Sequence, residues 1–358
     1  MHLSHLRLRD FRNYARLDVG FDQGFHVLLG NNAQGKTNIL ESIYLMATLR
    51  SFRGVGGAQM IRHQQKGYFI GATVVTDVEH DVKIYWSSSE RKIGLNGDPV
   101  RRLSDYIGTL RAVVFCSEDL QLVKGTARIR RRFIDLLLSQ TQPGYLETLQ
   151  RYTRAVRSRN AVLKRPKIDP AVLDSFSKEV VELGNQLIDA RKKLVPKISP
   201  LVRLAYRRIS NDAEELHMEY KSSVKDDFSS ELAASAERER RYKSTVVGPH
   251  RDELDLQLDE RAAAKFGSEG QKRSLVVALK MAQAEYLTGV LGVPPVLLID
   301  DVMGELDVNR RAGLLPLLER SHHAMGQVFM TCTEENWPRE LSRDLNKWEV
   351  NSGSLRAI

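Results

Sequence analysis

Gly30-Asn31-Asn32-Ala33-Gln34-Gly35-Lys36-Thr37 is the stretch of sequence that decides the fold. It follows a short apolar run at residues 25–29, and apolar residues recur at helical spacing from Ile39 onward. This order of strand, glycine loop and helix is typical of the phosphate-binding P-loop. In such a loop the glycines let backbone N–H groups turn toward the phosphates, Lys36 supplies a positive charge, and the Thr37 hydroxyl can bind Mg²⁺. Because an accidental match to four constrained positions is rare, the octet and the following Asn38 predict a nucleoside triphosphate site.

The composition is that of a soluble globular protein with more than one domain: 358 residues, 42% hydrophobic and 28% charged. The N-terminus has no apolar export signal and no apolar stretch reaches membrane-spanning length, so we expect a cytoplasmic protein without membrane association. Two distant cysteines, Cys116 and Cys332, favour neither a disulfide framework nor a zinc site. The formal charge of +9 favours a polyanionic partner, although charge alone leaves a solvated basic surface equally open.

Strand and helix patterns divide the chain into three parts. Residues 1–118 read as strands around the P-loop helix, residues 119–243 are helical in pattern, and residues 244–358 return to strands, turns and shorter helices. We expect an α/β fold in which the first and third parts share one sheet. The middle part is then a helical arm domain inserted between them.

The arm is predicted to contain a short antiparallel helical hairpin. Apolar residues recur by threes and fours over residues 145–163 and again over residues 173–194. Between these runs, Asp169 and Pro170 are residue types that favour a helix N-cap and a first helical position. A second helix from Asp169 to Leu194 would be about 40 Å long at 1.5 Å per residue, which is too short for a long coiled coil.

A second motif is the apolar strand at residues 296–299, which ends in Asp300 and Asp301. In α/β sheets the carboxyl ends of parallel strands carry the chemistry. Together with the P-loop, this pattern predicts that Asp300 holds Mg²⁺ with Thr37 and that Asp301 orients or deprotonates the attacking water. By itself, the pair could equally be an acidic turn. Lys36, Asp300 and Asp301 are the candidate catalytic residues.

A third motif, Ser268-Glu269-Gly270-Gln271, directly precedes a long helical pattern. Alone, a serine beside a glycine is a routine helix start. Its position about thirty residues before the double aspartate favours a nucleotide-binding function for Ser268, Gly270 and Gln271, because helix N-termini bind anions.

These three motifs resemble those of the ABC-type ATPase heads of chromosome-maintenance and repair proteins. More closely, the chain is similar to the RecF family of bacterial recombination mediators. The similarity rests on the start 6–14, the octet, Phe115-Cys116-Ser117-Glu118-Asp119-Leu120, the segment 247–252, and Phe266-Gly267-Ser268-Glu269-Gly270-Gln271-Lys272-Arg273-Ser274. The total length and the short arm agree with that family, and neither a long coiled coil nor a zinc hook is present.

The resemblance implies ATP and Mg²⁺ as cofactors. It also implies an ATP-dependent head-to-tail homodimer, in which the signature helix of one subunit covers the γ-phosphate held by the P-loop of the other. Expected partners are DNA, RecO and RecR, in gap repair, replication maintenance and SOS induction. Two departures from the wider ABC pattern, an aspartate at 301 instead of glutamate and no histidine at 331–333, predict slow, weak ATPase activity. Residues 305–307 match the D-loop, while Glu118 and the pair Arg12 and Asn13 have open roles.

Sequence-nonspecific DNA binding is predicted for residues 121–168, which contain twelve basic and two acidic residues. Several of the arginines recur at helical spacing and can follow phosphates without reading bases. The alternative is a solvated surface with paired charges, although few acidic residues are available nearby. The candidate DNA contacts are Arg128, Arg131, Arg132, Arg154 and Arg157. The pattern does not say whether single-stranded DNA, duplex or a junction is preferred.

Two other functional classes share parts of this pattern. The motor subunit of a transporter has the same three motifs, but it usually carries the switch histidine and couples to a membrane domain. A small-molecule P-loop kinase needs neither the signature helix nor a dimer.

Overall fold

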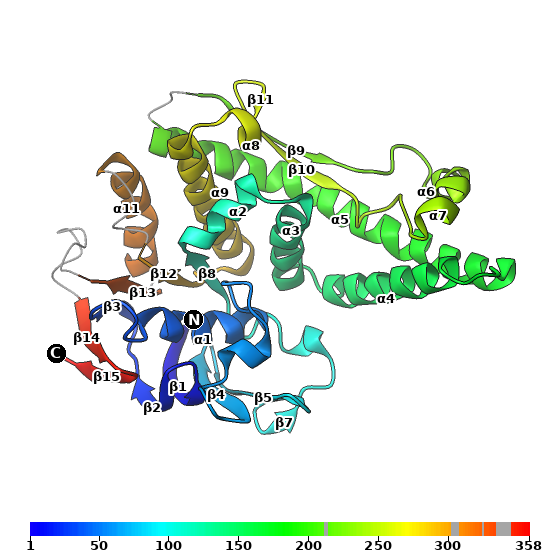
Figure 1. The fold of residues 1–358 in the computed structure, drawn as a ribbon. Coiled ribbons are helices and arrows are strands. Elements are labelled where there is room, and N and C mark those ends of the chain that lie inside the picture. The colour runs from blue at the N-terminus through cyan, green and yellow to red at the C-terminus, as the bar shows by residue number, and fades with distance from the viewer. Residues whose placement is uncertain (211–213, 302–307, 324–325, 334–344) are drawn as a thin grey trace. The chain divides into compact units, whose positions relative to one another are not determined.

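The computed structural model describes residues 1–210, 214–301, 308–323, 326–333 and 345–358 (Figure 1). The chain forms two compact units. The head unit comprises residues 1–120, 204–213 and 273–358, and the arm unit comprises residues 121–203 and 214–272. Each unit has its own sheet structure and its own buried side chains.

The first sheet of the head unit is antiparallel. Its strand order is β2 (Tyr14–Gly20), β1 (His2–Phe11), β4 (Gly67–Val75), β5 (Glu79–Ser87), β6 (Arg91–Leu95) and β7 (Asp98–Pro99). Asn96 and Gly97 have φ angles of 53° and 90°, which is the conformation a two-residue hairpin turn requires. The turn at Asn96 and Gly97 therefore connects β6 to β7.

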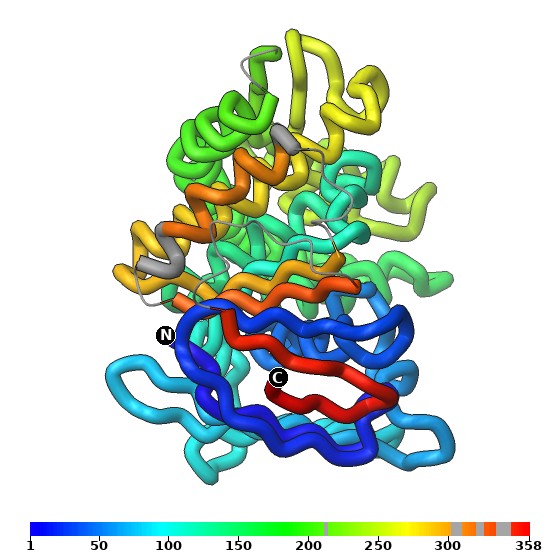
Figure 2. The backbone as a smooth tube through the Cα atoms, turned by 90° about the vertical axis from the view of Figure 1, so that its left-hand side faces the viewer, coloured from blue at the N-terminus to red at the C-terminus, as the bar shows by residue number. Residues whose placement is uncertain are grey.

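The second sheet of the head unit is parallel except for its last strand. Its order is β15 (Ser354–Ala357), β14 (Leu345–Asn351), β3 (Gly24–Leu29), β13 (Gln327–Cys332), β12 (Val296–Ile299) and β8 (Ala112–Phe115). Every residue of β8, β12 and β13 is buried, which explains why β8 and β12 are entirely apolar and β13 is mostly apolar. Figure 2 shows the C-terminal strands in red beside the N-terminal strands in blue. The first and third parts of the sequence thus share one sheet, as predicted.

Helix α1 (Lys36–Thr48) belongs to a core that also includes residues of both sheets. Its residues Ile39, Leu40 and Ile43 are fully buried, and each such side chain stabilises the fold by roughly 1.5–3 kcal/mol. The helix ends where Leu49 adopts a left-handed conformation. This packing fixes the start of α1, and with it the P-loop, relative to the parallel sheet.

The arm unit combines helices with a small sheet. Its strands, in spatial order, are β11 (Arg261–Ala262), β10 (Glu253–Leu258) and β9 (Leu216–Lys221). Its helices are α2 (Gln121–Lys124), α3 (Ala127–Thr141), α4 (Tyr145–Leu163), α5 (Pro170–Ser210), α6 (Phe228–Ala234), α7 (Ala236–Tyr242) and α8 (Ala263–Phe266). Helix α5 continues into the head unit, as does α9 (Glu269–Leu291), and α11 (Val308–His323) lies wholly in the head unit.

Helices α4 and α5 form the predicted antiparallel hairpin (Figure 1). Asp169 caps α5, because its carboxylate accepts hydrogen bonds from the backbone N–H groups of Ala171 (2.9 Å) and Val172 (3.3 Å). The predicted end near Leu194 is wrong, since α5 runs to Ser210. The buried stripe continues through Ile198 and Val202, while the two prolines inside the helix, at 196 and 200, lie on its exposed side.

Residues 244–272 belong to the arm unit, whereas the sequence pattern places them with the second part of the head. The reason is a pairing that the pattern does not reveal: β10 pairs with β9 and contacts α3. β9 itself lies in a region that we expected to be entirely helical. In the described part of the chain, no helix is long and apolar enough to cross a membrane.

Candidate nucleotide-binding site

The P-loop lies between β3 and α1, and two glycines are required by its geometry. Gly35 has a φ of 120°, and a Cβ at this position would lie 2.7 Å from the Asn13 amide nitrogen. Gly30 has a φ of 154°, and a Cβ there would lie 2.4 Å from the Val350 carbonyl oxygen. Both the backbone conformation and the close neighbours therefore exclude larger residues.

Side chains from two turns hold the loop in place. Asn13, between β1 and β2, donates to the Gln34 carbonyl (2.7 Å) and accepts from the Asn38 amide (2.8 Å). The Gln34 side chain accepts from the backbone N–H of Ser352 (2.8 Å), between β14 and β15. Gln34 thus acts as a structural anchor of the loop in addition to its predicted position in the phosphate motif. Tyr14 donates to the Gly35 carbonyl at 3.2 Å.

Lys36, Thr37 and Asp300 meet at the carboxyl edge of the parallel sheet. The Thr37 hydroxyl donates to the Asp300 carboxylate at 2.8 Å, although the two residues are 263 positions apart. The Lys36 ammonium group donates to the carbonyls of Gly30 (2.6 Å) and Asn31 (3.1 Å) and is only 4% exposed. The structure therefore brings together the predicted magnesium ligands and the predicted phosphate-binding lysine.

Asp300 lies in a mostly buried position at the end of β12. Burial raises the pKa of its carboxyl to about 6, while hydrogen bonds from Thr37 and Thr331 act in the opposite direction. The Thr331 hydroxyl, on the neighbouring strand β13, lies 3.0 Å from Asp300 and accepts from the backbone N–H of Asp301 at 2.9 Å. In the sequence, Thr331 stands out only as the start of a stretch that lacks histidine. Its position at the end of a strand that lies between β3 and β12 explains the contact.

A pocket of about 440 Å³ opens beside the P-loop. It is lined by Arg12, Asn13, Asn32, Ala33, Gly35, Lys36, Thr37, Asn38, Arg53, Gln59, Ile61 and Asp301. Asp301 reaches the pocket through a left-handed backbone conformation, with a φ of 53°. Three basic side chains around one opening suit a polyphosphate.

Arg12 is held rigidly at this pocket. Its guanidinium group makes two 2.7 Å hydrogen bonds to the buried carboxylate of Glu41 and a third, of 2.9 Å, to the Gln59 carbonyl. Glu41 also accepts from Ser51. Sequence patterns left the roles of Arg12 and Asn13 open and missed Arg53, because these residues come from turns and loops outside the motif.

The residues present fit Mg²⁺ and a nucleoside triphosphate. The oxygen atoms of Thr37 and Asp300 are the hard ligands that Mg²⁺ prefers. Helix α1 begins at Lys36, and the first backbone N–H groups of a helix have no partner within it. Lys36 is bonded to backbone carbonyls alone among the described residues, so phosphate oxygens can replace those acceptors.

The signature residues lie in the arm unit, at the start of α9. Ser268 and Gln271 form a capping box: the Gln271 N–H donates to the serine hydroxyl (3.1 Å), and the Ser268 N–H donates to the Gln271 side chain (2.6 Å). The Gln271 amide also donates to Glu214 (2.7 Å). Ser268 is exposed and Gly270 is partly exposed. Residues 305–307, which match the D-loop, lie outside the described residues.

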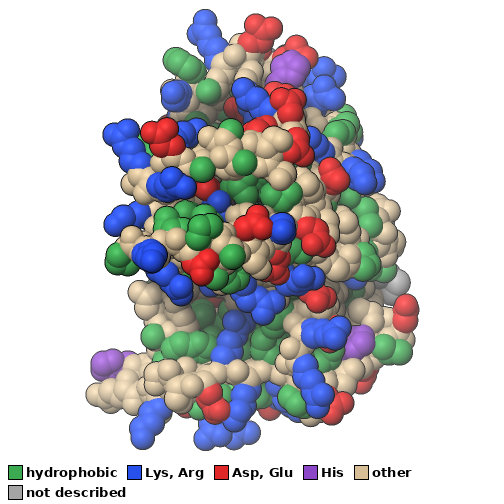
Figure 3. Space-filling view, turned by 90° about the vertical axis from the view of Figure 1, so that its right-hand side faces the viewer, with side chains coloured by type: hydrophobic (Ala, Val, Ile, Leu, Met, Phe, Trp, Pro, Cys, Tyr) green, Lys and Arg blue, Asp and Glu red, His purple; other side chains and the backbone are tan. Residues whose placement is uncertain are grey.

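The predicted DNA contacts have different surroundings in the arm unit. Arg128 and Arg132 on α3, and Arg154 and Arg157 on α4, are exposed. Arg131 is partly buried and donates to the Asp252 carbonyl at 2.5 Å. Figure 3 shows Lys and Arg side chains distributed over one face with Asp and Glu between them.

The expectation that scarce acidic residues would leave this region's arginines unpaired is wrong in three cases. Arg130 pairs with Glu253, Arg159 with Glu239 at 2.6 Å, and Arg151 with Glu179 at 3.7 Å. These carboxylates lie at residues 179–253, outside the stretch in which charges were counted. Arg130 and Arg159 are mostly buried and therefore belong to the fold of the arm rather than to its surface.

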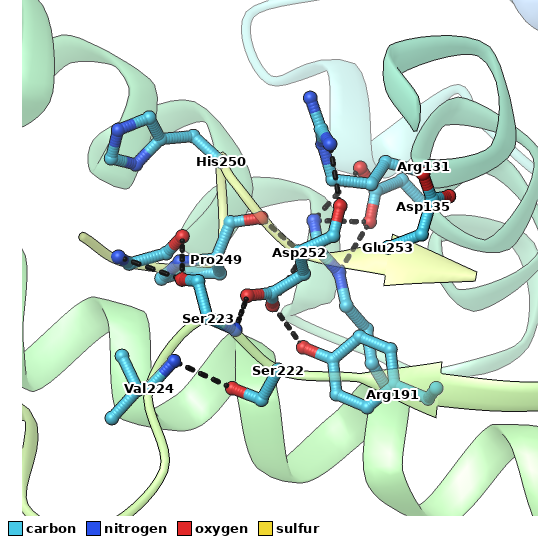
Figure 4. A network of polar contacts seen from close by, with 12 residues as sticks. Arg131, Asp135, Arg191, Ser222, Ser223, Val224, Pro249, His250, Asp252 and Glu253 are labelled. Atoms are coloured by element: carbon cyan, nitrogen blue, oxygen red, sulfur yellow. Dashed lines mark hydrogen bonds and ion pairs between the residues drawn. The ribbon is translucent and has the colours of Figure 1, made fainter. Parts of the chain in front are cut away.

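A buried polar network surrounds residues 247–252, one of the segments that carries the family resemblance (Figure 4). Arg191 is 2% exposed and contacts the carboxylates of Asp135 (2.8 Å) and Asp252 (3.3 Å) and the Pro249 carbonyl (2.7 Å). Burial acts to lower the pKa of Arg191, but Asp135 outweighs it, and the pKa lies well above its usual range. His250, in the same segment, is neutral at physiological pH because burial lowers its pKa to about 4.

Comparison with known proteins agrees with this geometry. The family described as RecF/RecN/SMC N terminal domain matches residues 2–346. The DNA replication and repair protein RecF of Symbiobacterium thermophilum is 37% identical over 372 residues, covering 99% of this chain and 98% of that protein. RecF of Streptococcus suis is 37% identical over 365 residues, covering 99% of both chains. The chain belongs to the RecF family.

Solved structures of RecF proteins share the whole fold. The structure of the recombination mediator RecF with ATP, from the RecFOR pathway, has a TM-score of 0.91 and 27% identity, covering 100% of this chain and 97% of that one. An Smc head domain from Pyrococcus furiosus has a TM-score of 0.58 at 14% identity, which shows a shared fold alone. RecF proteins and Smc heads therefore share the α/β ATPase head that the three motifs predict.

Proposed function

We propose that this RecF-family chain is an ATP-dependent DNA-binding mediator of recombinational gap repair, with roles in replication maintenance and SOS induction. The observation that carries the proposal is the meeting of Lys36, Thr37 and Asp300 beside a basic pocket. Support for ATP as the nucleotide comes from the related RecF structure with ATP. RecO and RecR are the expected protein partners, in line with the RecFOR pathway of that relative.

In this proposal, Thr37 and Asp300 hold Mg²⁺, and Lys36 and the backbone of residues 30–37 bind the phosphates. A Mg²⁺ ion held by these two residues would neutralise part of the phosphate charge. Asp301 orients the attacking water or accepts its proton. An aspartate is one methylene shorter than the usual glutamate, so we expect slow hydrolysis that times the release of the complex.

The signature residues of one copy of the chain act on the nucleotide bound to the P-loop of a second copy. Ser268 is exposed, and Phe266, two residues before it, is 67% exposed. An exposed aromatic beside an anion-binding helix start suits a surface that another subunit covers. We propose that ATP joins two copies head to tail, with Ser268 and Gly270 of each copy covering the γ-phosphate at the other copy's P-loop.

Nucleotide binding and light scattering, each with and without ATP, test this proposal on two variants. Lys36→Met is expected to bind ATP about 10- to 100-fold more weakly and to remain monomeric at ATP concentrations that join the parent protein. Ser268→Arg is expected to bind ATP and also to remain monomeric, because the arginine blocks the covering surface. If both variants bind ATP and dimerise like the parent protein, the shared site is wrong.

DNA binding is tested by fluorescence anisotropy on single-stranded, duplex and junction DNA across a range of salt concentrations. Phosphate contacts predict binding that is insensitive to sequence and weakens steeply with salt. DNA-stimulated ATP hydrolysis is expected as well. Phosphoryl transfer to a metabolite, or recovery with membranes, would instead favour a kinase or a transporter motor.

A further inference from the structure

Charge is divided sharply between the two halves of α5. Residues 170–189 contain four acidic residues and one lysine, whereas residues 190–210 contain seven Lys and Arg and no acidic residue. Both halves lie in one continuous helix. The C-terminal half lies outside the region in which the sequence predicted DNA contacts.

Most of the basic residues in this second half are exposed. Lys192, Lys193, Lys197 and Arg203 all have exposed side chains within the arm unit. At 100° per residue they fall within an arc of about 140° on the helix. Arg191, which precedes them directly, is the exception, since it is buried in the polar network. We call the four exposed residues the α5 ridge.

In the part of the chain that the structure describes, the positive charges of the α5 ridge are also not neutralised by ion pairs. Among the residues that the structure describes, none of its four side chains takes part in an ion pair. The first half of the same helix behaves differently: Lys178 pairs with Asp174 at 2.9 Å, and Glu179 forms a 3.7 Å ion pair with Arg151 of α4. Like charges concentrated without partners raise the electrostatic energy of the free protein, and a bound polyanion relieves that energy.

We propose that the α5 ridge binds the sugar-phosphate backbone of DNA, as a contact surface separate from the exposed arginines of α3 and α4. The inference rests on the proposed DNA-binding function. Protein–protein interfaces are depleted in lysine and enriched in aromatic residues. The composition of the ridge therefore favours DNA over an acidic protein as its partner. Between Lys192 and Arg203, the other exposed residues along this arc are prolines 196 and 200, which add no acidic or aromatic group. Beyond its two ends, the exposed residues on the same arc include Asp189 and Leu204.

The dimensions of the ridge suit a short run of backbone. From Lys192 to Arg203 the helix rises about 16 Å at 1.5 Å per residue. Duplex DNA carries one charge per about 1.7 Å of its axis, so several phosphates lie within reach of the four side chains. Such contacts position the protein on DNA and carry no sequence information.

The test uses the full-length protein and a triple variant, Lys192→Glu, Lys193→Glu and Lys197→Glu. The matched control is Lys178→Glu, which reverses an exposed lysine in the first half of the same helix. Binding to a fluorescent duplex is measured with ATP and Mg²⁺ between about 50 and 200 mM salt. ATP binding and light scattering are measured in parallel to establish that each variant remains folded and responds to nucleotide.

We expect the triple variant to bind DNA at least about tenfold more weakly, with a salt dependence reduced by about three phosphate contacts. The control should bind like the parent. If the triple variant binds DNA as tightly as the parent, the ridge does not contact DNA, although the protein still binds it. If the parent does not bind DNA, the proposed function itself is wrong. If DNA binding is unchanged but the triple variant loses binding to a synthetic poly-glutamate peptide that the parent binds, the ridge is a protein-docking surface instead.

Discussion

Charged side chains of the P-loop and of the buried networks in the arm unit have opposite roles. In the P-loop of the head unit, Lys36 contacts two backbone carbonyls and Thr37 contacts Asp300, all of which a nucleotide and its metal can replace or share. In the arm unit, Arg191 and Arg159 are buried and already bonded to carboxylates. Lys36, whose partners are exchangeable carbonyls, therefore lies in a ligand site, whereas Arg159 and Arg191, whose partners are carboxylates, stabilise the fold of the arm.

Replacement of Arg191 by methionine gives the largest expected effect on stability. The change leaves Asp135 and Asp252 without their cationic partner, and breaking a buried pair in this way costs about 3–5 kcal/mol. Urea denaturation measures the loss. The control is Lys192→Met, the neighbouring exposed residue on the same helix, which should change the free energy of unfolding by less than about 0.5 kcal/mol. If both changes alter the free energy of unfolding equally, the polar network around Arg191 does not stabilise the fold as we propose.

The second prediction concerns pH and His250. Its side chain contacts Tyr152 at 2.6 Å and the Thr245 carbonyl at 3.0 Å, and burial lowers its pKa from 6.5 to about 4. The unfolded chain therefore binds this proton more tightly than the folded chain. The stability contribution is complete above pH 6.5 and is lost as the pH falls through 4, by about 3 kcal/mol in total.

Denaturation curves between pH 4 and 7, without Mg²⁺, measure this contribution as the difference between the parent and His250→Gln. Asp300 acts in the opposite direction, because its raised pKa makes its contribution decline as the pH rises toward 6. The difference between the two proteins removes that background. Parallel pH curves for both would contradict the buried, neutral state of His250.

Lys36→Met tests the charge that we place in the ligand site. It should reduce ATP affinity by about 10- to 100-fold, the amount expected for hydrogen bonds from a charged donor. The free energy of unfolding should change little, because Lys36 contacts backbone carbonyls and no carboxylate among the described residues. Lys66→Met, at an exposed position in the head unit, is the control for both measurements. A variant with a much lower free energy of unfolding but an unchanged ATP affinity would show that Lys36 has a structural role and does not bind the nucleotide.

The smallest expected effect concerns the exposed pair between Lys124 and Glu269, which lies beside the signature. The distance is short, 2.6 Å, but solvent screens such pairs. Lys124→Met should therefore lower the free energy of unfolding by less than about 1 kcal/mol in urea denaturation. If Lys124→Met lowers the free energy of unfolding as much as Arg191→Met does, solvent exposure does not decide how much an ion pair contributes to stability.

The sequence predicted the head site better than the arm, for a physical reason. The P-loop and the strand ending in Asp300 are local patterns, and the rule that parallel strands align their carboxyl ends is enough to bring Thr37 and Asp300 together. The role of Arg12 stayed open, and the positions of Arg53 and Thr331 at the site were not predicted, because loop and neighbouring-strand contacts leave no periodic signal in the sequence.

In the arm, the deciding contacts span long stretches of sequence. Arg159 and Glu239 are 80 residues apart, and Arg130 and Glu253 are 123 residues apart. A charge count within one segment therefore cannot distinguish surface arginines from buried ones. The same limitation concealed β9, whose partner β10 lies on the far side of two helices in the sequence.

The central claim is that one chain carries two incomplete parts of a nucleotide site that two copies complete together. Mixing Lys36→Met with Ser268→Arg tests it most directly, because the mixed dimer regains one site with an intact P-loop and an intact signature. Light scattering with ATP should detect dimers in the mixture and in neither variant alone. A mixture that remains as monomeric as its components, under conditions in which the parent dimerises, would contradict the account.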